Sequence, residues 1–280
     1  MKPGAGQAVS ADHMKVKAQS FNFGGGLWHV SGYGSLIRNL VSKQLHLKYR
    51  GSALGFLWSL LNPLTMVLVY TLVFRYIMRV PVENYALFLV AGVIHWEFFS
   101  AAMSDSTGAI IENRDLIRKI NFPTIILPAS QVIFELIQLG LAFAAFMLIY
   151  LVFGGSLWWG HLLYPVALFI QFVFVLGISA LISASTVFLR DLQHLVQIAL
   201  RLMFWLTPIV YPLTSVPAGT APFFQINPMT SYVVIYRALL YDKAWPGMFW
   251  WVSAIGFAVV SFAIGVSLFT FLSPRFAEEV

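Results

Sequence analysis

Six long apolar runs divide this chain, and they constrain its fold more than any other feature. A helix needs about 20 consecutive apolar residues to cross a bilayer. The runs cover residues 56–78, 85–104, 124–153, 162–189, 198–213 and 247–272. With 59% hydrophobic residues, the sequence predicts an all-α integral membrane protein with six transmembrane helices over 56–272. The fifth run contains Thr207-Pro208 and Tyr211-Pro212, so its helix should kink or stop inside the membrane.

The segments that flank these runs are predicted to lie on or outside the membrane. Residues 31–55 should form an amphipathic interface helix, although a soluble surface helix is an alternative. One arc of that helix is polar, and Arg38, Gln44 and Lys48 interrupt its apolar side. Residues 1–30 lack the apolar core of a secretory signal peptide and are expected to be a mobile cytoplasmic tail, with a second tail at 273–280. The apolar, proline-rich loop after the fifth run predicts re-entrant helices there.

A charged island lies at residues 112–123, between the second and third runs, in a chain with only 10% charged residues. At 100° per residue its apolar side chains Leu116, Ile117 and Ile120 fall within about a third of a turn. The island should therefore form a short amphipathic helix. Pro123 keeps Phe122 extended, so the helix should end just before the third span. Its apolar residues have two possible contacts, lipid headgroups or a groove on another protein.

The distribution of Lys and Arg predicts the orientation in the membrane. With the amino terminus inside, twelve of these residues fall in cytoplasmic segments and three, Arg79, Arg237 and Lys243, fall in outer segments. Both termini and the island should therefore face the cytoplasm. The net charge of +6 is dispersed among the spans, which favours contact with anionic lipid headgroups over nucleic acid.

The sequence contains no recognisable enzymatic site. It has no cysteine and no G-x-x-x-x-G-K-[ST], H-E-x-x-H, G-x-S-x-G or D-x-D motif, so we expect no bound metal and no nucleotide site on this chain. If the protein uses ATP, another chain must bind it. A membrane-embedded transferase would need an acidic cluster, whereas the only multiply charged loop is mixed in sign.

Besides Arg75, near the end of the first run, four ionisable residues lie within the predicted spans, where charges are costly. They are His95, Glu97, Glu135 and Arg201. Pairing inside the protein or a position near a headgroup layer is one interpretation, and a proton relay is the other. The relay would make the chain a proton-coupled secondary transporter, but no inverted repeat is visible.

Aromatic residues are abundant, with 9 Trp, 11 Tyr and 25 Phe. Several lie near the middle of a span, including Tyr70, Phe74, Phe204 and Trp205. Flat rings can line a path for sugar rings, because they offer apolar faces and few strong hydrogen bonds. For any single ring, lipid contact or helix packing is the alternative.

Three stretches together resemble the transmembrane subunit of polysaccharide-exporting ABC transporters of the type-2 family. The first runs from Lys48 through Trp58 to Asn62-Pro63. The second is the charged island. The third joins Phe188-Leu189-Arg190-Asp191-Leu192, Thr207-Pro208-Ile209-Val210-Tyr211-Pro212 and Ile226-Asn227-Pro228-Met229. The order and spacing agree over about residues 34–272.

The resemblance implies a permease that forms a homodimer around a central tunnel. Two cytoplasmic ATPase subunits would bind ATP and Mg, and this chain would bind no cofactor. The expected cargo is a lipid-linked polysaccharide such as O antigen, with capsule and teichoic acid as alternatives. The expected location is the bacterial inner membrane.

The resemblance also implies roles for individual residues. The ATPase contact would be a coupling helix with Asn113, Arg114, Asp115, Leu116, Ile117 and Lys119. Lys43, His46 and Arg50 would lie at the cytoplasmic entrance, where cations attract a pyrophosphate-linked lipid. The tunnel lining would be Trp58, Tyr70, Phe74, Phe204 and Trp205. The outer gate, between spans five and six, would include Tyr211, Phe223, Phe224, Asn227 and Tyr232.

Overall fold

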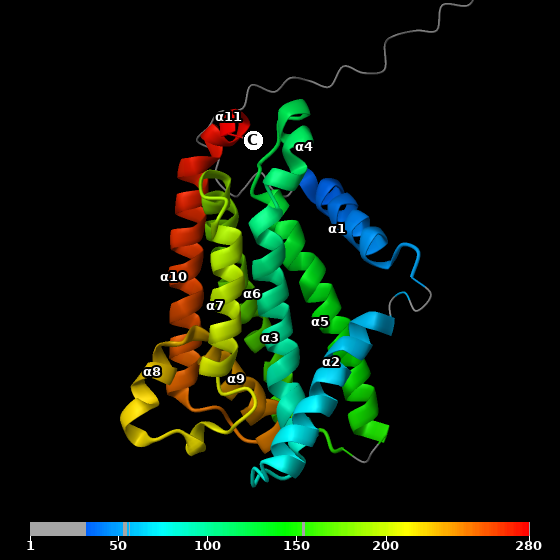
Figure 1. The fold of residues 1–280 in the computed structure, drawn as a ribbon, viewed down its shortest axis with the longest axis vertical. Helices are drawn as coiled ribbons and strands as arrows, with labels where there is room; N and C mark the ends of the chain where they lie inside the picture. Colours follow the sequence, from blue (N-terminus) through cyan, green and yellow to red (C-terminus); the bar gives the residue numbers. More distant parts are fainter. Residues whose placement is uncertain (1–31, 53–54, 56, 153–154, 280) are drawn as a thin grey trace, which may run out of the picture.

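The computed structural model describes residues 32–52, 55, 57–152 and 155–279. The tail expected at 1–30 lies outside this part of the chain. The expectation of an all-α fold is confirmed for the described residues (Figure 1). The helices are α1 (Gly34–Tyr49), α2 (Leu57–Tyr70), α3 (Tyr85–Gly108), α4 (Arg114–Lys119), α5 (Ile126–Val152), α6 (Tyr164–Phe188), α7 (Leu192–Leu206), α8 (Ala221–Ile226), α9 (Pro228–Arg237), α10 (Met248–Leu272) and α11 (Phe276–Glu279).

Four segments are long and apolar enough to cross a membrane, namely Tyr85–Gly108, Ile126–Val152, Trp159–Phe188 and Met248–Arg275. They match the second, third, fourth and sixth expected spans, so the chain is a multi-pass membrane protein. The first and fifth expected spans contain the shorter apolar helices Leu64–Ile77 and Leu192–Leu206. The count of six spans therefore stays a prediction.

The fifth apolar helix is shifted relative to the expected 198–213. α7 begins at Leu192, directly after the Arg190-Asp191 turn, and ends at Leu206. Thr207 is extended, with φ −101° and ψ 133°, because the ring of Pro208 disfavours helical backbone in the preceding residue. The proline therefore ends the helix where the sequence suggested a kink or a stop.

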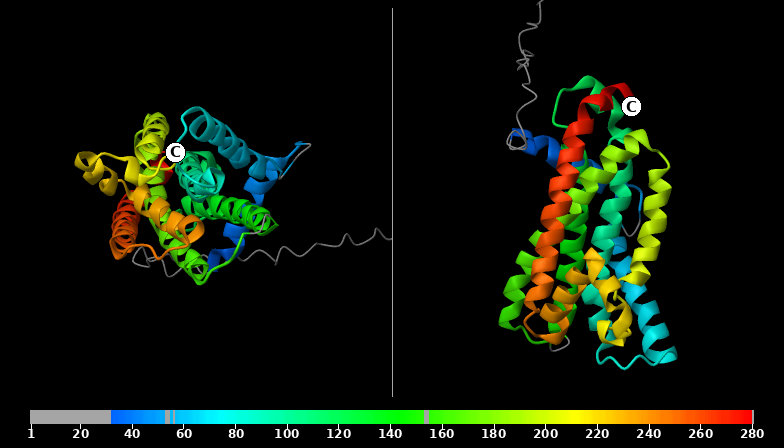
Figure 2. Two further views of the ribbon diagram at one scale, coloured as in Figure 1. Left: turned by 90° about the horizontal axis from the view of Figure 1, so that it is seen from below. Right: turned by 90° about the vertical axis from the view of Figure 1, so that its left-hand side faces the viewer.

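α3 forms the centre of the bundle. α2 and α7 lie on either side of it (Figures 1 and 2), and α5, α6 and α9 also pack against it. Most of its residues are buried, from Tyr85 to Gly108. A helix that is apolar on all sides is typical of a core position.

α6 and α10 form the most extensive contact between two helices. Their backbones meet where Gly177 faces Ser261 and Gly265, and a Cβ atom on Gly265 would overlap the carbonyl group of Gly177. The Ser261 hydroxyl donates a hydrogen bond to the Phe174 carbonyl oxygen at 3.2 Å. Small residues allow such close approach between membrane helices.

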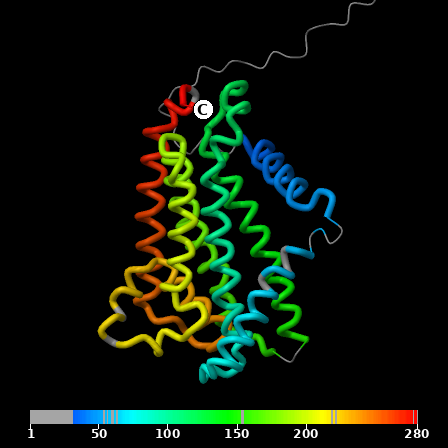
Figure 3. The backbone as a smooth tube through the Cα atoms, in the orientation of Figure 1, coloured from blue at the N-terminus to red at the C-terminus, as the bar shows by residue number. Residues whose placement is uncertain are grey.

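The tube in Figure 3 shows that α1, α4 and α11 gather at one end of the bundle and α8 at the other. We call these the α4 end and the α8 end. Apart from the main hydrophobic core around α3, a second hydrophobic cluster fills the α4 end and includes Leu40, Ile110, Phe122, Ile126, Phe269 and Phe276. The described residues of the tail expected at 273–280 form a turn and α11, and Phe276 is completely buried. This segment therefore packs against the bundle.

Candidate functional site

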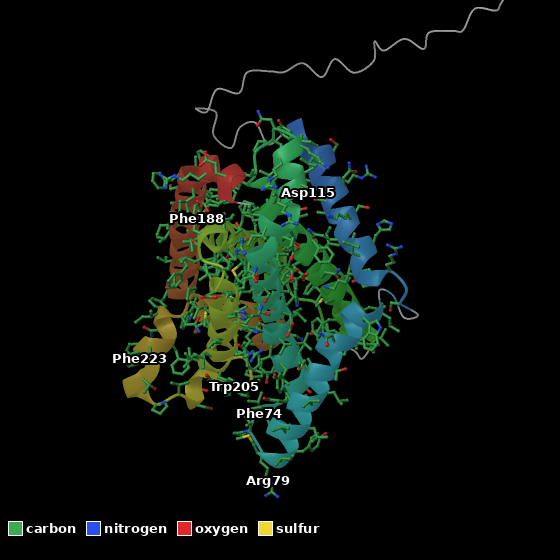
Figure 4. The ribbon with its side chains drawn as sticks, turned by 45° about the horizontal axis from the view of Figure 1, so that its top comes forward. Phe74, Arg79, Asp115, Phe188, Trp205 and Phe223 are labelled. Carbon is green, nitrogen blue, oxygen red and sulfur yellow. The ribbon has the colours of Figure 1, made fainter. Side chains whose placement is uncertain are left out.

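The charged island forms the tip of the α4 end. A 3-10 turn (Ile111–Asn113) leads into α4, where an acidic residue lies in the first turn and two basic residues lie in the last. That arrangement suits the helix dipole. Figure 4 shows Asp115 at this tip. Arg114, Asp115 and Lys119 are exposed, so the tip offers both signs of charge to a partner.

Leu116 and Ile117 face the protein itself. Both are partly buried against the second hydrophobic cluster. Ile120, expected on the same apolar face, follows the helix in an extended conformation and is 52% exposed. The helix ends at Lys119, earlier than Pro123 suggested, and the extended residues after it bring Phe122 into the cluster. The two apolar residues of α4 therefore anchor the tip.

The three basic residues expected at an entrance share the outer surface of α1 and its end. Lys43, His46 and Arg50 are all exposed. The His46 ring nitrogen Nδ1 lies 2.7 Å from the Ser42 carbonyl oxygen. The three side chains are accessible to a ligand at the α4 end.

Lys48 and Tyr49, at the end of α1, turn towards α5. Lys48 Nζ lies 3.6 Å from Glu135 Oε1, and the Tyr49 hydroxyl donates a hydrogen bond to Gln138 Oε1 at 2.8 Å. Glu135 is buried, so the ion pair offsets the cost of placing its charge within α5. The interpretation of Glu135 as internally paired is confirmed. The signal in the sequence was Lys48 itself, a cation on the apolar side of an amphipathic helix.

A cavity of about 430 Å³ opens beside this ion pair, between the end of α1 and helices α2, α3 and α5. Its lining includes Lys48, Trp58, Asn62, Glu97 and Glu135. Trp58, expected in the tunnel, lies here, apart from the other four tunnel candidates. Arg201 is exposed on α7 and does not line this cavity, so Glu97, Glu135 and Arg201 do not share it as a proton path.

The other four tunnel candidates form one aromatic row across α2, the π-helical segment η2 (Thr71–Ile77) that continues it, and α7. The rings of Tyr70 and Phe204 stack with centroids 5.7 Å apart. Phe74 follows Tyr70 at 6.3 Å, and Trp205 follows Phe204 at 5.2 Å. Trp96 of α3 supports the row from behind, 5.7 Å from Phe204. Tyr70, Phe74 and Phe204 are partly buried against the core, whereas Trp205 is 55% exposed, so the row reaches the surface of the protomer at Trp205. Figure 4 labels Phe74 and Trp205 of this row.

The gate candidates surround the break after α7. The Asn227 side chain donates hydrogen bonds to Leu206 O at 3.2 Å and to Thr207 Oγ1 at 2.8 Å. Its oxygen accepts the Met229 N–H and so caps α9. The Tyr211 hydroxyl donates to Trp205 O at 2.7 Å. Asn227 therefore joins the end of α7 to the start of α9.

The remaining gate candidates occupy different environments. Phe223 is 73% exposed on α8, and Phe224 makes an edge contact with Tyr211 at 6.3 Å. Tyr232 is fully buried in α9, and its hydroxyl donates to Ala254 O at 2.9 Å. Tyr232 thus anchors α9 to α10 in this conformation, and Phe223 is accessible.

Arg237 is a central residue that the sequence reasoning placed in an outer loop. It is buried at the end of α9, with its guanidinium 3.6 Å from the centroid of the Phe88 ring. It donates hydrogen bonds to the carbonyl oxygens of Ile209 and Tyr211, in the segment where the helix is broken. A lone arginine after a proline-broken helix was the available signal, because broken helices leave carbonyl groups without partners.

A buried polar network holds α9 in place on its other side. The His95 ring stacks on Tyr236 with centroids 3.4 Å apart. The Tyr236 hydroxyl donates to Gln171 Oε1 at 2.7 Å, and Gln171 Nε2 donates to His95 O at 3.1 Å. His95, the fourth ionisable residue predicted within a span, is therefore internally bonded between α3, α6 and α9.

Three known proteins are similar to this chain in sequence. An O-antigen export system permease protein of Myxococcus xanthus is 34% identical over 250 residues, covering 89% of this chain and 96% of that protein. A Klebsiella pneumoniae protein of the same name is 32% identical over 248 residues, or 85% and 92% of the two chains. A polysialic acid transport protein of Escherichia coli is 23% identical over 211 residues, or 72% and 79%.

A protein-family model described as ABC-2 type transporter matches residues 35–241. The matched region runs from α1 to η7 (Ala238–Asp242), and so includes α4, the aromatic row and the α7 break. Since that region is most of the chain, and the two O-antigen export permease proteins align over 96% and 92% of their length, this chain belongs to the ABC-2 type transporter family.

Proposed function

We propose that the chain is the permease subunit of an ATP-driven exporter that moves a lipid-linked polysaccharide of the O-antigen class across the bacterial inner membrane. The names of the relatives support this function. Those named for O-antigen export are 31–34% identical, and those named for polysialic acid transport are 22–23% identical. The identities favour O antigen over capsule.

The observation that carries the proposal is the aromatic row. Tyr70, Phe74, Phe204 and Trp205 come from two helices on either side of α3, yet their rings form one continuous series. Sugar rings stack on such faces without strong directional bonds to slow their passage. In a homodimer, two such rows would face each other across a tunnel. The exposed apolar surfaces of α2 and α7 support that assembly.

The energy source lies on another chain in this proposal. The permease sequence has no nucleotide-binding motif, and α4 offers a charged tip held firmly by Leu116 and Ile117. Two cytoplasmic ATPase subunits, carrying ATP and Mg, would each contact one α4. The α4 end would then face the cytoplasm, as the Lys and Arg count favours, with both termini there. Lys43, His46 and Arg50 would meet the pyrophosphate-linked lipid at the same end.

Complementation tests the transport function. The chain, expressed with its ATPase partner in a strain whose own O-antigen permease is deleted, should restore polysaccharide on the cell surface. A partner that binds but cannot hydrolyse ATP should abolish that signal. Transport that continues with the inactive partner and follows a pH gradient would contradict the proposal and support the secondary transporter.

A charge exchange at the tip of α4 tests the ATPase contact. The double variant Arg114→Glu with Asp115→Lys keeps the net charge and changes only exposed side chains. We expect co-purification of the ATPase to fall at least tenfold, while the permease stays folded. Arg79→Asn, at the α8 end (Figure 4), is the control and should not alter assembly. Unchanged assembly of the double variant would remove the coupling role.

The entrance is tested by a second variant. Arg50→Ala should reduce export while assembly with the ATPase stays intact, because a cation near the pyrophosphate is lost. Normal export by Arg50→Ala would exclude this residue from cargo binding.

A further inference from the structure

A cavity of about 1040 Å³ lies at the α8 end, on a different side of α2 from the aromatic row. Its walls come from α2, from the π-helical segment η2 (Thr71–Ile77) that continues α2, and from α3, α5 and η7. Figure 4 labels Arg79 at this end, in the turn between η2 and α3. The proposed path for the polymer uses none of its lining residues.

The deep part of the cavity is apolar. Its walls include Val67, Val90, Ile94, Ala142, Ala145 and Phe146. Along α3 the cavity runs from Ile94 to Asn84, ten residues that span about 15 Å at the rise of an α-helix. This length is about half of the hydrocarbon core of a bilayer. The cavity as a whole, from its mouth to its deep end, therefore matches the depth of one leaflet.

The mouth of the cavity carries charges of both signs. Its lining includes the cations Arg75 and Lys243 and the carboxylates Glu83 and Asp242, all of which are exposed. Lys243 Nζ donates a hydrogen bond to Ser156 Oγ at 2.6 Å. The Tyr241 hydroxyl donates to Glu83 O at 2.7 Å and so joins the two sides of the mouth. Two cations and two carboxylates give a mouth with no net charge.

The backbone around this mouth is unusual in two independent respects. Asn84 and Lys243 have left-handed backbone, with φ of 42° and 51°, which is uncommon outside glycine. The two π-helical segments η2 and η7 both line the cavity. Strained backbone and π-helical turns both occur often at functional sites. The buried Thr71 hydroxyl also lines the cavity and has no hydrogen-bond partner among the described residues.

We propose that this cavity is a binding site for one zwitterionic glycerophospholipid, such as phosphatidylethanolamine, from the leaflet at the α8 end. An acyl chain occupies the apolar part. The phosphate lies against Lys243 and Arg75, and the ammonium group lies against Glu83 and Asp242. Charge-assisted hydrogen bonds of this kind are strong. A polyprenyl diphosphate carries phosphate and a long chain as well, but its negative charges would meet the two carboxylates.

Photo-crosslinking tests the proposal on the full chain assembled with its ATPase in nanodiscs. Three probes, each with a photoreactive group on the lipid chain, are compared: phosphatidylethanolamine, phosphatidylglycerol and a polyprenyl diphosphate. We expect the ethanolamine probe to label the cavity walls on α3 and α5 most strongly, as mapped by mass spectrometry. Dominant labelling by polyprenyl diphosphate would assign the site to the cargo and overturn the proposal.

Two neighbouring alanines of α5 provide matched variants. Ala145 lines the cavity, whereas Ala144 is exposed and does not. Ala145→Trp should reduce labelling by the ethanolamine probe at least tenfold, and Ala144→Trp should leave it unchanged. Equal labelling in both variants would mean that the probe reacts with the outer surface of the bundle, which would overturn the proposal.

Changes at the mouth test the headgroup without altering the apolar core. The double variant Glu83→Gln with Asp242→Asn removes both carboxylates from exposed positions. It should shift the labelling ratio of ethanolamine to glycerol probe at least fivefold towards glycerol. Lys243→Asn keeps a residue that tolerates left-handed backbone and should weaken labelling by both phospholipid probes. An unchanged ratio in the double variant would overturn the assignment of a zwitterionic headgroup.

Discussion

α7 and α9, which are separated in the chain by the short helix α8, differ strongly in burial. In α9 nearly every residue is buried, and the helix packs against α3, α6 and α10. In α7 only Val196 and Leu200 are buried, and Leu195, Ile198, Leu202 and Trp205 are exposed. α7 is the more apolar of the two helices, yet it is also the more exposed. The difference shows that apolar composition does not distinguish a helix fixed in the protomer from one available for lipid, a second copy or cargo.

The largest loss of stability is expected from a substitution at the contact between α6 and α10. Gly265→Leu places a side chain on the Gly177 carbonyl group, and overpacking of this kind costs about 3 kcal/mol. We expect loss of monodisperse protein in detergent and a large fall in the unfolding temperature. Gly256→Leu is the control on the same helix, because a Cβ atom there meets no other atom within 4 Å. Similar stability of the two variants would contradict the close crossing.

The attachment of α9 to the broken segment depends on Arg237. Arg237→Met keeps most of the side-chain volume but loses hydrogen bonds to two carbonyl groups. Hydrogen bonds to charged groups contribute about 2 kcal/mol each, so we expect a clear fall in the unfolding temperature and faster proteolysis within 207–227. Arg201→Met, on the exposed surface of α7, should change neither. Wild-type resistance to proteolysis in Arg237→Met would show that α9 is held without this residue.

Substitutions at the contact between α1 and α5 should lower the stability less than those at Gly265 and Arg237. Lys48→Ala leaves Glu135 buried without its cation. Because the Lys48 side chain is 44% exposed, we expect a loss of only about 1 kcal/mol in the free energy of unfolding. Adding Glu135→Gln should recover most of the loss, while Lys43→Ala, on the exposed face, should cost nothing. Lys48 Nζ also lies 4.9 Å from the centroid of the Phe134 ring, and a full loss that persists in the double variant would assign the effect to that contact.

Substitutions on the exposed face of α7 should have the smallest effects on stability and a selective effect on transport. Trp205→Ala is expected to reduce export severalfold without lowering the unfolding temperature, because its ring is largely exposed. Trp205→Phe keeps a stacking face and should export nearly normally. Trp159→Ala is the control, because it removes another exposed tryptophan, at 82% exposure, that lies outside the aromatic row. Equal export by Trp205→Ala and the wild type would remove the row from the path.

The same comparison explains which features of the fold and the site could be predicted from the sequence. Apolar run length predicted six spans, and four of them are confirmed as helices long and apolar enough to cross a bilayer, because length and composition decide whether a helix can do so. Tyr70, Phe74, Phe204 and Trp205 could be predicted to matter, but their common row requires the arrangement of α2 and α7 around α3. Arg237 was assigned to a loop because counting charges assumes that they face water. The carbonyl groups of Ile209 and Tyr211 are free to accept its hydrogen bonds only because the helix ends before Pro208, and α9 packs against that segment.

The contact between Gly177 and Gly265 has a consequence for motion. Helices that slide past one another in shear movements do so over a layer of side chains that can change rotamer. Where α6 and α10 cross, no such layer exists, because the backbone of one helix touches the backbone of the other. The pair must therefore move as one rigid unit. In the proposed exporter, α2 and α7 would have to pivot against that unit to widen the path, with the extended Thr207 as the hinge of α7.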